Sequence, residues 1–292
     1  MKIAEVKKMP PIERFLYWIR ERDQILKKRR AGFPKPWTDD EILQTQYFTN
    51  VRREDDRVTI WFRENVRDRL KDDPIVVFAT IAFRWFNLPA PTGEYLNSHG
   101  YLENWNMEKA IGGLLRFQNS GLKVFTGAFN ISNSGSTKPK VNRVCEDYIQ
   151  PVWKDLGVIL AKFRLGTTAC TLANAFKVLK GYPGLGGSGF MAGQVVCDLA
   201  YTDFFQHASD WHTFCTWGPG SKRGMNRVFG EHEDYAMPRA IWDRNLFYLM
   251  EVVEKRLNIK LHARDLQNCL CEMGKYERGL EGTRLKRRYP GK

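Results

Sequence analysis

The chain has 292 residues, 43% of them apolar and 13% aromatic, so it can bury a sizeable core and does not have a disordered composition. Its net charge of +13 favours a polyanionic partner such as nucleic acid, or an anionic membrane surface. No apolar run reaches the roughly 18 residues that a membrane span needs, and the N-terminus has no signal-peptide pattern. We therefore expect a cytoplasmic protein that does not associate with a membrane.

The apolar pattern predicts a mainly α-helical fold. Residues 11–30 have helical spacing, and "TDDE" (38–41) predicts a capping box in which Thr38 caps and Glu41 reaches back. The best strand signal is "KVFTGAFNI" (123–131). Further helices are expected near residues 54–70, 74–87, 106–118, 143–163, 168–180, 190–204, 238–257 and 262–275.

Domain organisation and cysteine use follow from the same pattern. We expect a single domain over residues 1–292 with two helical lobes, and the exposed loop "SNSGSTKPK" (132–140) places their boundary near 132–142. The six cysteines include no C-x-x-C pair, so we expect reduced and mostly buried thiols and no cysteine-bound metal.

A glycine-rich connection, "GYPGLGGSG" (181–189), joins two expected helices and gives a helix–hairpin–helix over residues 168–204. Pro183 stops the first helix, and Gly184 and Gly186 permit a tight turn at positive φ. Amides at the start of the second helix would then bind an anion such as a DNA phosphate. An ordinary connection between core helices is the alternative, whereas a Walker A loop fails because no lysine follows these glycines. The residues expected at the phosphate are Gly184, Gly186, Gly187 and Ser188.

The hairpin "YPGLGGSGFMAGQV" (182–195) resembles the helix–hairpin–helix of the DNA glycosylase superfamily. The resemblance implies a glycosylase-like fold in which two helical lobes flank a cleft. It also implies a catalytic aspartate one helix downstream, which places Asp210 of "SDWHTF" (209–214) in that role and His212 nearby as a proton relay. The hairpin lysine of the bifunctional members and their C-terminal iron–sulfur cysteines are missing, which argues against base excision with strand cleavage.

Four segments spread over the chain carry a narrower resemblance. They resemble the phage amino acid:DNA transferases, also described as α-glutamyl/putrescinyl thymine pyrophosphorylases, and the related helical domain of hydroxymethyluracil DNA kinases. The resemblance implies thymine hypermodification in the host cytoplasm, where an amine displaces pyrophosphate from 5-pyrophosphoryloxymethyluracil in DNA. The kinase P-loop pattern is absent, which favours the transferase. The four segments are "QYFTNVRREDDRVT" (46–59), "VFTGAFNI" (124–131), "TWGPGSKRGMNRVFG" (216–230) and "LQNCLCEMGKYERG" (266–279).

This reaction would use double-stranded DNA bearing a modified thymine and an amine such as glycine, putrescine or glutamate. The target base must leave the stack, donors must hold the leaving pyrophosphate, and a base must take a proton from the incoming ammonium. Asp210 is the first candidate for that base or for binding the ammonium, and a helix N-cap is its alternative role. Magnesium could neutralise the pyrophosphate through carboxylate oxygens, although no ligand spacing requires it.

The second glycine cluster, "WGPGSKRG" (217–224), suits the leaving group. Gly218 and Gly220 would allow close backbone approach to it. A DNA-phosphate site and a surface loop of solvated cations are the alternatives. The residues expected to hold the pyrophosphate here are Ser221, Lys222 and Arg223.

Two charged segments complete the expected site. In "TNVRREDDR" (49–57), Arg53 and Arg57 would share a helical face and bind phosphate, while Asp56 orients the phosphate or binds the amine. Asn50 could read a uracil edge, and a solvated salt-bridge face is the alternative interpretation of the whole segment. In "LCEMGKYERG" (270–279), the polar residues Glu272, Lys275 and Arg278 would support the site or meet the DNA.

Two other functions stay open from the sequence. A monofunctional glycosylase of the same fold would use Asp210 to release a modified base. A non-catalytic module would only bind DNA, and the basic tail "TRLKRRYPGK" (283–292) would add salt-sensitive affinity in either case.

Overall fold

The computed structural model describes residues 3–131 and 135–283, which divide into two compact units. Residues 1–56 and 215–292 belong to the first unit, and residues 57–214 form the second. The boundary expected near 132–142 is therefore not where the chain divides, since this segment lies inside the second unit; its residues 132–134 are outside the described ranges. The tail from residue 284 onward is also outside them.

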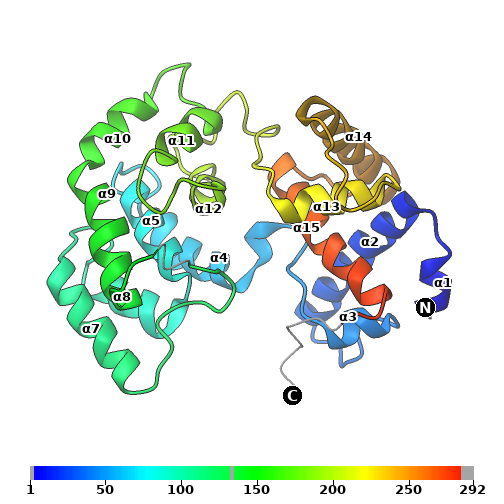
Figure 1. Cartoon of the computed structure of the whole chain (residues 1–292), viewed down its shortest axis with the longest axis horizontal. Helices are drawn as coiled ribbons and strands as arrows, with labels where there is room; N and C mark the ends of the chain where they lie inside the picture. Colours follow the sequence, from blue (N-terminus) through cyan, green and yellow to red (C-terminus); the bar gives the residue numbers. More distant parts are fainter. Residues whose placement is uncertain (1–2, 132–134, 284–292) are drawn as a thin grey trace. The chain divides into compact units, whose positions relative to one another are not determined.

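Helices dominate the first unit and confirm the expected mainly α fold (Figure 1). The long helix expected over residues 11–30 is present with those bounds, and the one expected at 262–275 is longer at its C-terminal end. The first unit contains α1 (Ile3–Lys7), α2 (Pro11–Arg30), α3 (Glu41–Thr45), the 3₁₀ turn η1 (Arg53–Asp55), α13 (Pro219–Val228), α14 (Arg239–Leu257) and α15 (Ala263–Leu280).

The second unit is also helical, and its described residues contain no β-strand. The strand expected over 123–131 is wrong, because this segment instead packs its aromatic rings: Phe125 stacks on Phe86, and Phe129 meets Phe190 edge-on. The elements are α4 (Arg57–Phe62), η2 (Arg63–Arg67), α5 (Val76–Phe86), η3 (Pro89–Gly93), α6 (Glu94–Ser98), α7 (Met107–Asn119), α8 (Lys140–Arg143), η4 (Val144–Ile149), α9 (Gln150–Lys154), α10 (Leu156–Phe163), α11 (Leu172–Leu179) and α12 (Phe190–Leu199).

Two local details differ from the sequence predictions. Asp40, not Thr38, caps α3, because its carboxylate accepts the amides of Ile42 and Leu43, each at 2.9 Å. The helix expected over 54–70 is interrupted at Asp56, whose ψ of 135° is extended. Arg53 and Arg57 therefore do not share a helical face.

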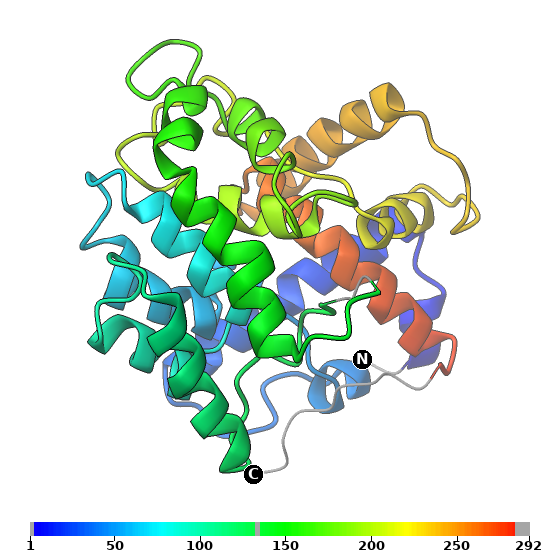
Figure 2. The same ribbon diagram turned by 60° about the vertical axis from the view of Figure 1, so that its left-hand side comes forward.

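Helices α13 and α15 pack against each other with their backbones close together, and they lie side by side in both views (Figure 1, Figure 2). Glycines make this approach possible. A Cβ on Gly224 would lie 1.8 Å from the carbonyl oxygen of Leu270, and one on Gly220 would lie 2.4 Å from the sulfur of Cys271. Gly220 thus allows α15 to pack closely on α13. The sequence alone instead predicts that it allows a leaving group to approach the backbone.

Helix α5 forms the centre of the second unit, since every one of its residues is buried. Its one charged side chain, Arg84, forms a two-pronged ion pair with Asp198 of α12: Nε to Oδ2 is 2.5 Å and Nη2 to Oδ1 is 2.6 Å. Asn87 and Thr59 accept two further guanidinium hydrogens at 2.6 and 3.1 Å. Four of the five guanidinium hydrogens therefore have an acceptor, which offsets much of the cost of burying the ion pair.

Removing one partner of this pair should be costly. We expect Asp198→Ala to lower the free energy of unfolding by about 3–5 kcal/mol, because it leaves the Arg84 guanidinium buried without a counter-charge. Urea unfolding measures this change. Asp203→Ala is the control, since that exposed carboxylate lies 3.6 Å from Lys71 and should cost less than about 1 kcal/mol. Equal losses in the two variants would contradict the assigned importance of the buried pair.

The glycine-rich connection joins α11 to α12 as expected. Gly184 has a φ of +73°, as predicted, whereas the other left-handed positions are Gly187 and Gly189 and not Gly186. Gly186 is needed for space, because a Cβ there would lie 2.9 Å from the carbonyl oxygen of Lys180. Leu185 is fully buried and anchors the turn. Gly187 and Ser188, farther along the turn, are exposed.

Candidate active site

The first unit brings together residues 49–56 and 270–279, from two of the segments expected at the site, although more than 200 residues separate them in the sequence. The stretch from Tyr47 to Asp56 runs along α15 and is held by side chains of that helix. Glu272 accepts the amide of Thr49 at 3.1 Å, and Asp265 accepts the amide of Arg53 at 3.0 Å. The Asn268 amide donates to the Thr49 hydroxyl at 2.9 Å. The irregular stretch therefore has a fixed path over the helix.

Asp56 lies at the end of this stretch, and its environment favours the protonated form. Its Oδ1 accepts the backbone amide of Asn50 at 3.0 Å. The pKa of Asp56 is raised to about 6, chiefly because surrounding protein atoms remove water from the carboxylate. The Asn50 amide and the Arg53 cation lower this pKa in part, and the negative charge of Glu272 raises it further. The carboxyl group thus changes protonation close to neutral pH.

A second carboxyl group, Asp265, behaves in the same way. It is buried in the first turn of α15, where Oδ2 lies 3.1 Å from Nε2 of His262, the N-cap residue. Burial raises the pKa of Asp265 to about 6, against the opposing effect of the Arg53 amide and of nearby arginines. Two carboxyl groups with raised pKa values therefore flank Arg53, which is an arrangement found at functional sites more often than elsewhere.

Positively charged side chains lie around these carboxyl groups, and two of them donate hydrogen bonds to backbone carbonyl oxygens. Arg22 of α2 is buried, and its Nη2 donates to the carbonyl oxygens of Phe48 at 3.0 Å and Thr49 at 3.2 Å. Lys275 donates to the carbonyl of Tyr47, and its Nζ lies 4.4 Å from the ring centroid of Phe48. The site therefore combines proton-accepting carboxylates with fixed positive charge.

The raised pKa of Asp56 has a consequence for stability. Between its ordinary value of 3.8 and about 6, the folded protein keeps a proton on Asp56 that the unfolded chain has released. Stability from this group is therefore present at low pH and lost as pH rises through 6. The side chain introduced by Asp56→Asn cannot ionise, so this variant should not share this loss. As the pH rises from 4 to 7, we expect its free energy of unfolding to increase by about 1–3 kcal/mol relative to that of the unmodified protein, as measured by urea unfolding. A stability difference between Asp56→Asn and the unmodified protein that stays the same from pH 4 to pH 7 would contradict the raised pKa of Asp56.

Several sequence-predicted residues have other partners in the structure. The Asn50 side chain donates to the carbonyl of Asp55 at 2.7 Å, so its amide is used to shape the turn and is not directed at a base edge. Arg57 begins α4 and belongs to the second unit. Ser221 is only 1% exposed and exchanges hydrogen bonds with the Gly218 backbone at the start of α13, so it offers no free donor to an anion.

The two cations that follow Ser221 are placed differently. Lys222 is exposed, with its Nζ 3.8 Å from the ring centroid of Trp217, whereas Arg223 is half-buried. Glu272 and Lys275 lie on α15 beside the 47–56 stretch, with Nζ of Lys275 3.6 Å from Oε2 of Glu272. Their expected supporting position is therefore compatible with the structure.

Asp210 and His212 lie in the second unit. Both carboxylate oxygens of Asp210 accept backbone amides at the start of α11, from Leu172 at 2.9 Å and from Ala173 at 2.8 Å. This is the geometry of a helix-capping carboxylate, although the helix that it caps lies earlier in the chain. His212 is exposed and packs edge-on against Trp211. The structure thus gives Asp210 a capping role, and its role as a base stays a prediction.

Comparison with known proteins identifies the family. The family described as "5-hmdU DNA kinase, helical domain" matches residues 10–283. The chain belongs to this family. The match spans all the segments that carry the narrower resemblance, so the predicted relation to the kinase helical domain is confirmed.

A relative within this family is the 5-hmdU DNA kinase of Bacillus phage SP10. It is 27% identical to the chain over 298 aligned positions, which cover 91% of this chain and 46% of the relative. The chain thus spans about half the length of the curated relative that it matches. No solved structure matches it significantly. None of the helices in residues 3–131 and 135–283 has the length and apolar character that crossing a membrane would require.

Sequence reasoning missed two residues of the candidate site. Arg22 occupies an apolar position of α2, three residues after Ile19 and three before Ile25, and both of these are buried. A charged residue in such a stripe signals a buried polar partner. Asp265 lies four residues before Cys269 and seven before Glu272, so the same face of α15 carries all three.

In the described part of the chain, no group of three or more His, Cys, Asp or Glu side chains could hold a metal ion.

Proposed function

We propose that the chain replaces the pyrophosphate of 5-pyrophosphoryloxymethyluracil in DNA with an amine. The observation that carries the proposal is Asp56, a carboxylate with a pKa raised to about 6, beside Arg53 and in a site shared with Asp265 and Glu272. Support also comes from the family, which is named after a 5-hmdU DNA kinase, and from the net charge of +13.

The transfer step requires a proton acceptor. An amine arrives as an ammonium ion, which has no lone pair for attack, so one proton must leave before or during bond formation. Asp56 accepts that proton, the amine nitrogen forms a bond to the exocyclic methylene carbon, and the carbon–oxygen bond to pyrophosphate breaks. A carboxylate with a pKa of about 6 is a stronger base than an ordinary aspartate, yet it is still ionised at pH 7.

The other charges of the site have complementary roles in the proposal. Glu272 and Asp265 attract the ammonium group, and Arg53 stabilises the negative charge that develops on the leaving pyrophosphate. Lys222 and Arg223 on α13 are further proposed phosphate ligands. The substrate thymine is expected to leave the duplex stack, because its methylene carbon must enter a pocket before an amine can reach it.

A mass assay of nucleosides tests this function. The protein is incubated with duplex DNA that carries pyrophosphorylated hydroxymethyluridine and with one amine at a time, and the digested nucleosides are weighed. We expect a nucleoside whose mass corresponds to the added amine, together with one released pyrophosphate for each transfer. An abasic site would show glycosylase activity instead, and unchanged nucleosides with every amine would contradict the transferase proposal.

A further inference from the structure

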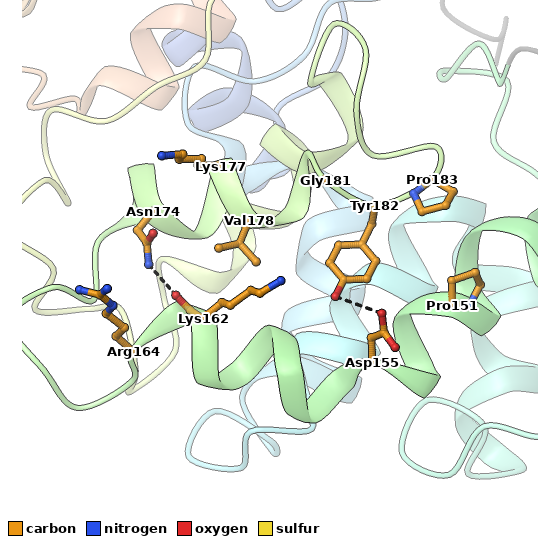
Figure 3. A pocket seen from close by; sticks show the side chains of 10 residues that line it. All are labelled: Pro151, Asp155, Lys162, Arg164, Asn174, Lys177, Val178, Gly181, Tyr182 and Pro183. Carbon is orange, nitrogen blue, oxygen red and sulfur yellow. Dashed lines mark hydrogen bonds between the residues drawn. The ribbon is translucent and has the colours of Figure 1, made fainter.

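The second unit contains a hollow of about 800 Å³ that the candidate active site does not use. Helices α10 and α11 form its walls, and the start of the glycine-rich turn forms its rim (Figure 3). We propose that this hollow binds the phosphodiester backbone of the DNA substrate. The inference rests on the proposed function for its choice of DNA as the partner, and its test is independent of amine transfer.

Charge is the first argument. Three cations, Lys162, Arg164 and Lys177, line the hollow against a single carboxylate, Asp155. Asp155 is the acceptor for the Tyr182 hydroxyl at 3.4 Å. Within the described residues, the side chains of the three cations have neither an ion-pair partner nor a hydrogen bond. Their charge is therefore available to an outside anion.

The arrangement of these side chains is the second argument. Lys162 extends beneath Val178 toward Tyr182, while Arg164 and Lys177 lie on either side of Asn174 (Figure 3). Asn174 is fixed by a hydrogen bond from its Nδ2 to the carbonyl oxygen of Lys162 at 2.9 Å. Three separate cations and the Asn174 amide thus lie around Val178, and such spaced cations can contact successive phosphates of an extended chain.

The backbone of Arg164 supplies a third argument. This residue ends α10 in the left-handed conformation, with φ of 54° and ψ of 48°. Glycine and asparagine adopt this conformation readily, whereas an arginine there costs on the order of 1 kcal/mol. The strain places a cation at the edge of the hollow, and strained residues of this kind are concentrated at binding sites.

The glycine-rich turn gives the hollow a continuation. Gly181 and Pro183 line it, and the exposed Gly187 and Ser188 follow along the same turn. A DNA strand lying in the hollow can therefore continue past the turn. This makes a backbone of linked phosphates a better occupant than free pyrophosphate, although both share the same chemistry.

A matched pair of variants tests the proposal in the full chain. Lys162→Gln/Lys177→Gln removes two charges from the hollow, and Lys109→Gln/Lys123→Gln removes two exposed charges from elsewhere in the same unit. Fluorescence anisotropy with an unmodified duplex gives Kd at several salt concentrations. We expect the first variant to bind about 10–100-fold more weakly, with the slope of log K against log salt reduced by about 2. The control should retain most of its affinity and its full slope.

A third variant addresses the strained cation at the edge of the hollow. Arg164→Asn keeps a residue that tolerates the left-handed conformation, and it should reduce the slope by about 1. Unchanged thermal midpoints confirm that the variants are folded. Unaltered DNA affinity in Lys162→Gln/Lys177→Gln, or equal losses in the control, would overturn the proposal. A loss of binding to inorganic pyrophosphate without a loss for DNA would also overturn it. If the unmodified protein fails to transfer amines, the DNA result still stands.

Discussion

Asp56→Asn is expected to lower kcat for amine transfer by about 10²- to 10⁴-fold, the usual contribution of a positioned general base. The amide keeps the shape of the side chain and can still accept the Asn50 amide, but it cannot take a proton. Single-turnover measurements of the aminated nucleoside by mass spectrometry give this rate directly.

The pH dependence separates a base from a merely structural residue. With Asp56 protonated below its pKa of about 6, the rate of the unmodified protein should fall about tenfold for each pH unit below 6 and level off above it. In Asp56→Asn this limb should disappear. A variant that loses rate but keeps the limb would assign the base elsewhere, and Asp210→Asn would then be the next variant to measure.

Asp55→Asn is the matched control for this prediction. Its carboxylate lies one residue away and pairs at 2.8 Å with Arg30, whose side chain is about half exposed. Such pairs contribute about 0–1 kcal/mol, so kcat should change by less than about threefold. Similar losses in both variants would indicate that the 47–56 stretch has been disturbed, and would contradict a specific role for Asp56.

Gly224→Ala is expected to lower the free energy of unfolding by about 3 kcal/mol or more. The new Cβ would lie 1.8 Å from the backbone oxygen of Leu270, which cannot move aside as a flexible side chain can. Helices α13 and α15 must separate, and overpacking of this kind commonly costs about 1–3 kcal/mol even among side chains. Urea unfolding with the linear extrapolation measures the change.

Gly157→Ala provides the opposite expectation for the same substitution. Gly157 lies inside α10, and a Cβ there would have no neighbour within 4 Å. Alanine should therefore stabilise the helix by about 0.5–1 kcal/mol, because glycine loses more conformational freedom on folding. If Gly224→Ala is as well tolerated as Gly157→Ala, the close packing of α13 on α15 is not needed for stability.

Sequence periodicity was sufficient for the long helices. Helix α2 has the predicted bounds because its apolar residues recur with helical spacing over about five turns. The break at Asp56 was not predictable in this way, since "TNVRREDDR" has helix-compatible composition and the chain is bent by bonds to Glu272 and Asp265, more than 200 residues away. Tertiary contacts therefore overrode local preference at the candidate site.

The glycine clusters also show what the sequence alone could not predict. A glycine in a sequence indicates either an unusual φ or a need for space, and only coordinates distinguish the two. At Gly184 the φ is positive, whereas Gly220 and Gly224 make room for α15. The sequence also could not locate Asp210 at the start of α11, because a capping carboxylate usually belongs to the helix that follows it.

The division of the first unit into residues 1–56 and 215–292 has a consequence for biosynthesis. On the ribosome, α2 and the 47–56 stretch emerge long before α15, which must supply their packing partners. At about 5–20 residues per second, they wait on the order of ten seconds or more for it. During that interval the apolar face of α2 lacks its cover, while the inserted segment 57–214 can already fold. The candidate active site is thus completed late, and nascent chains stalled before residue 263 should depend on chaperones.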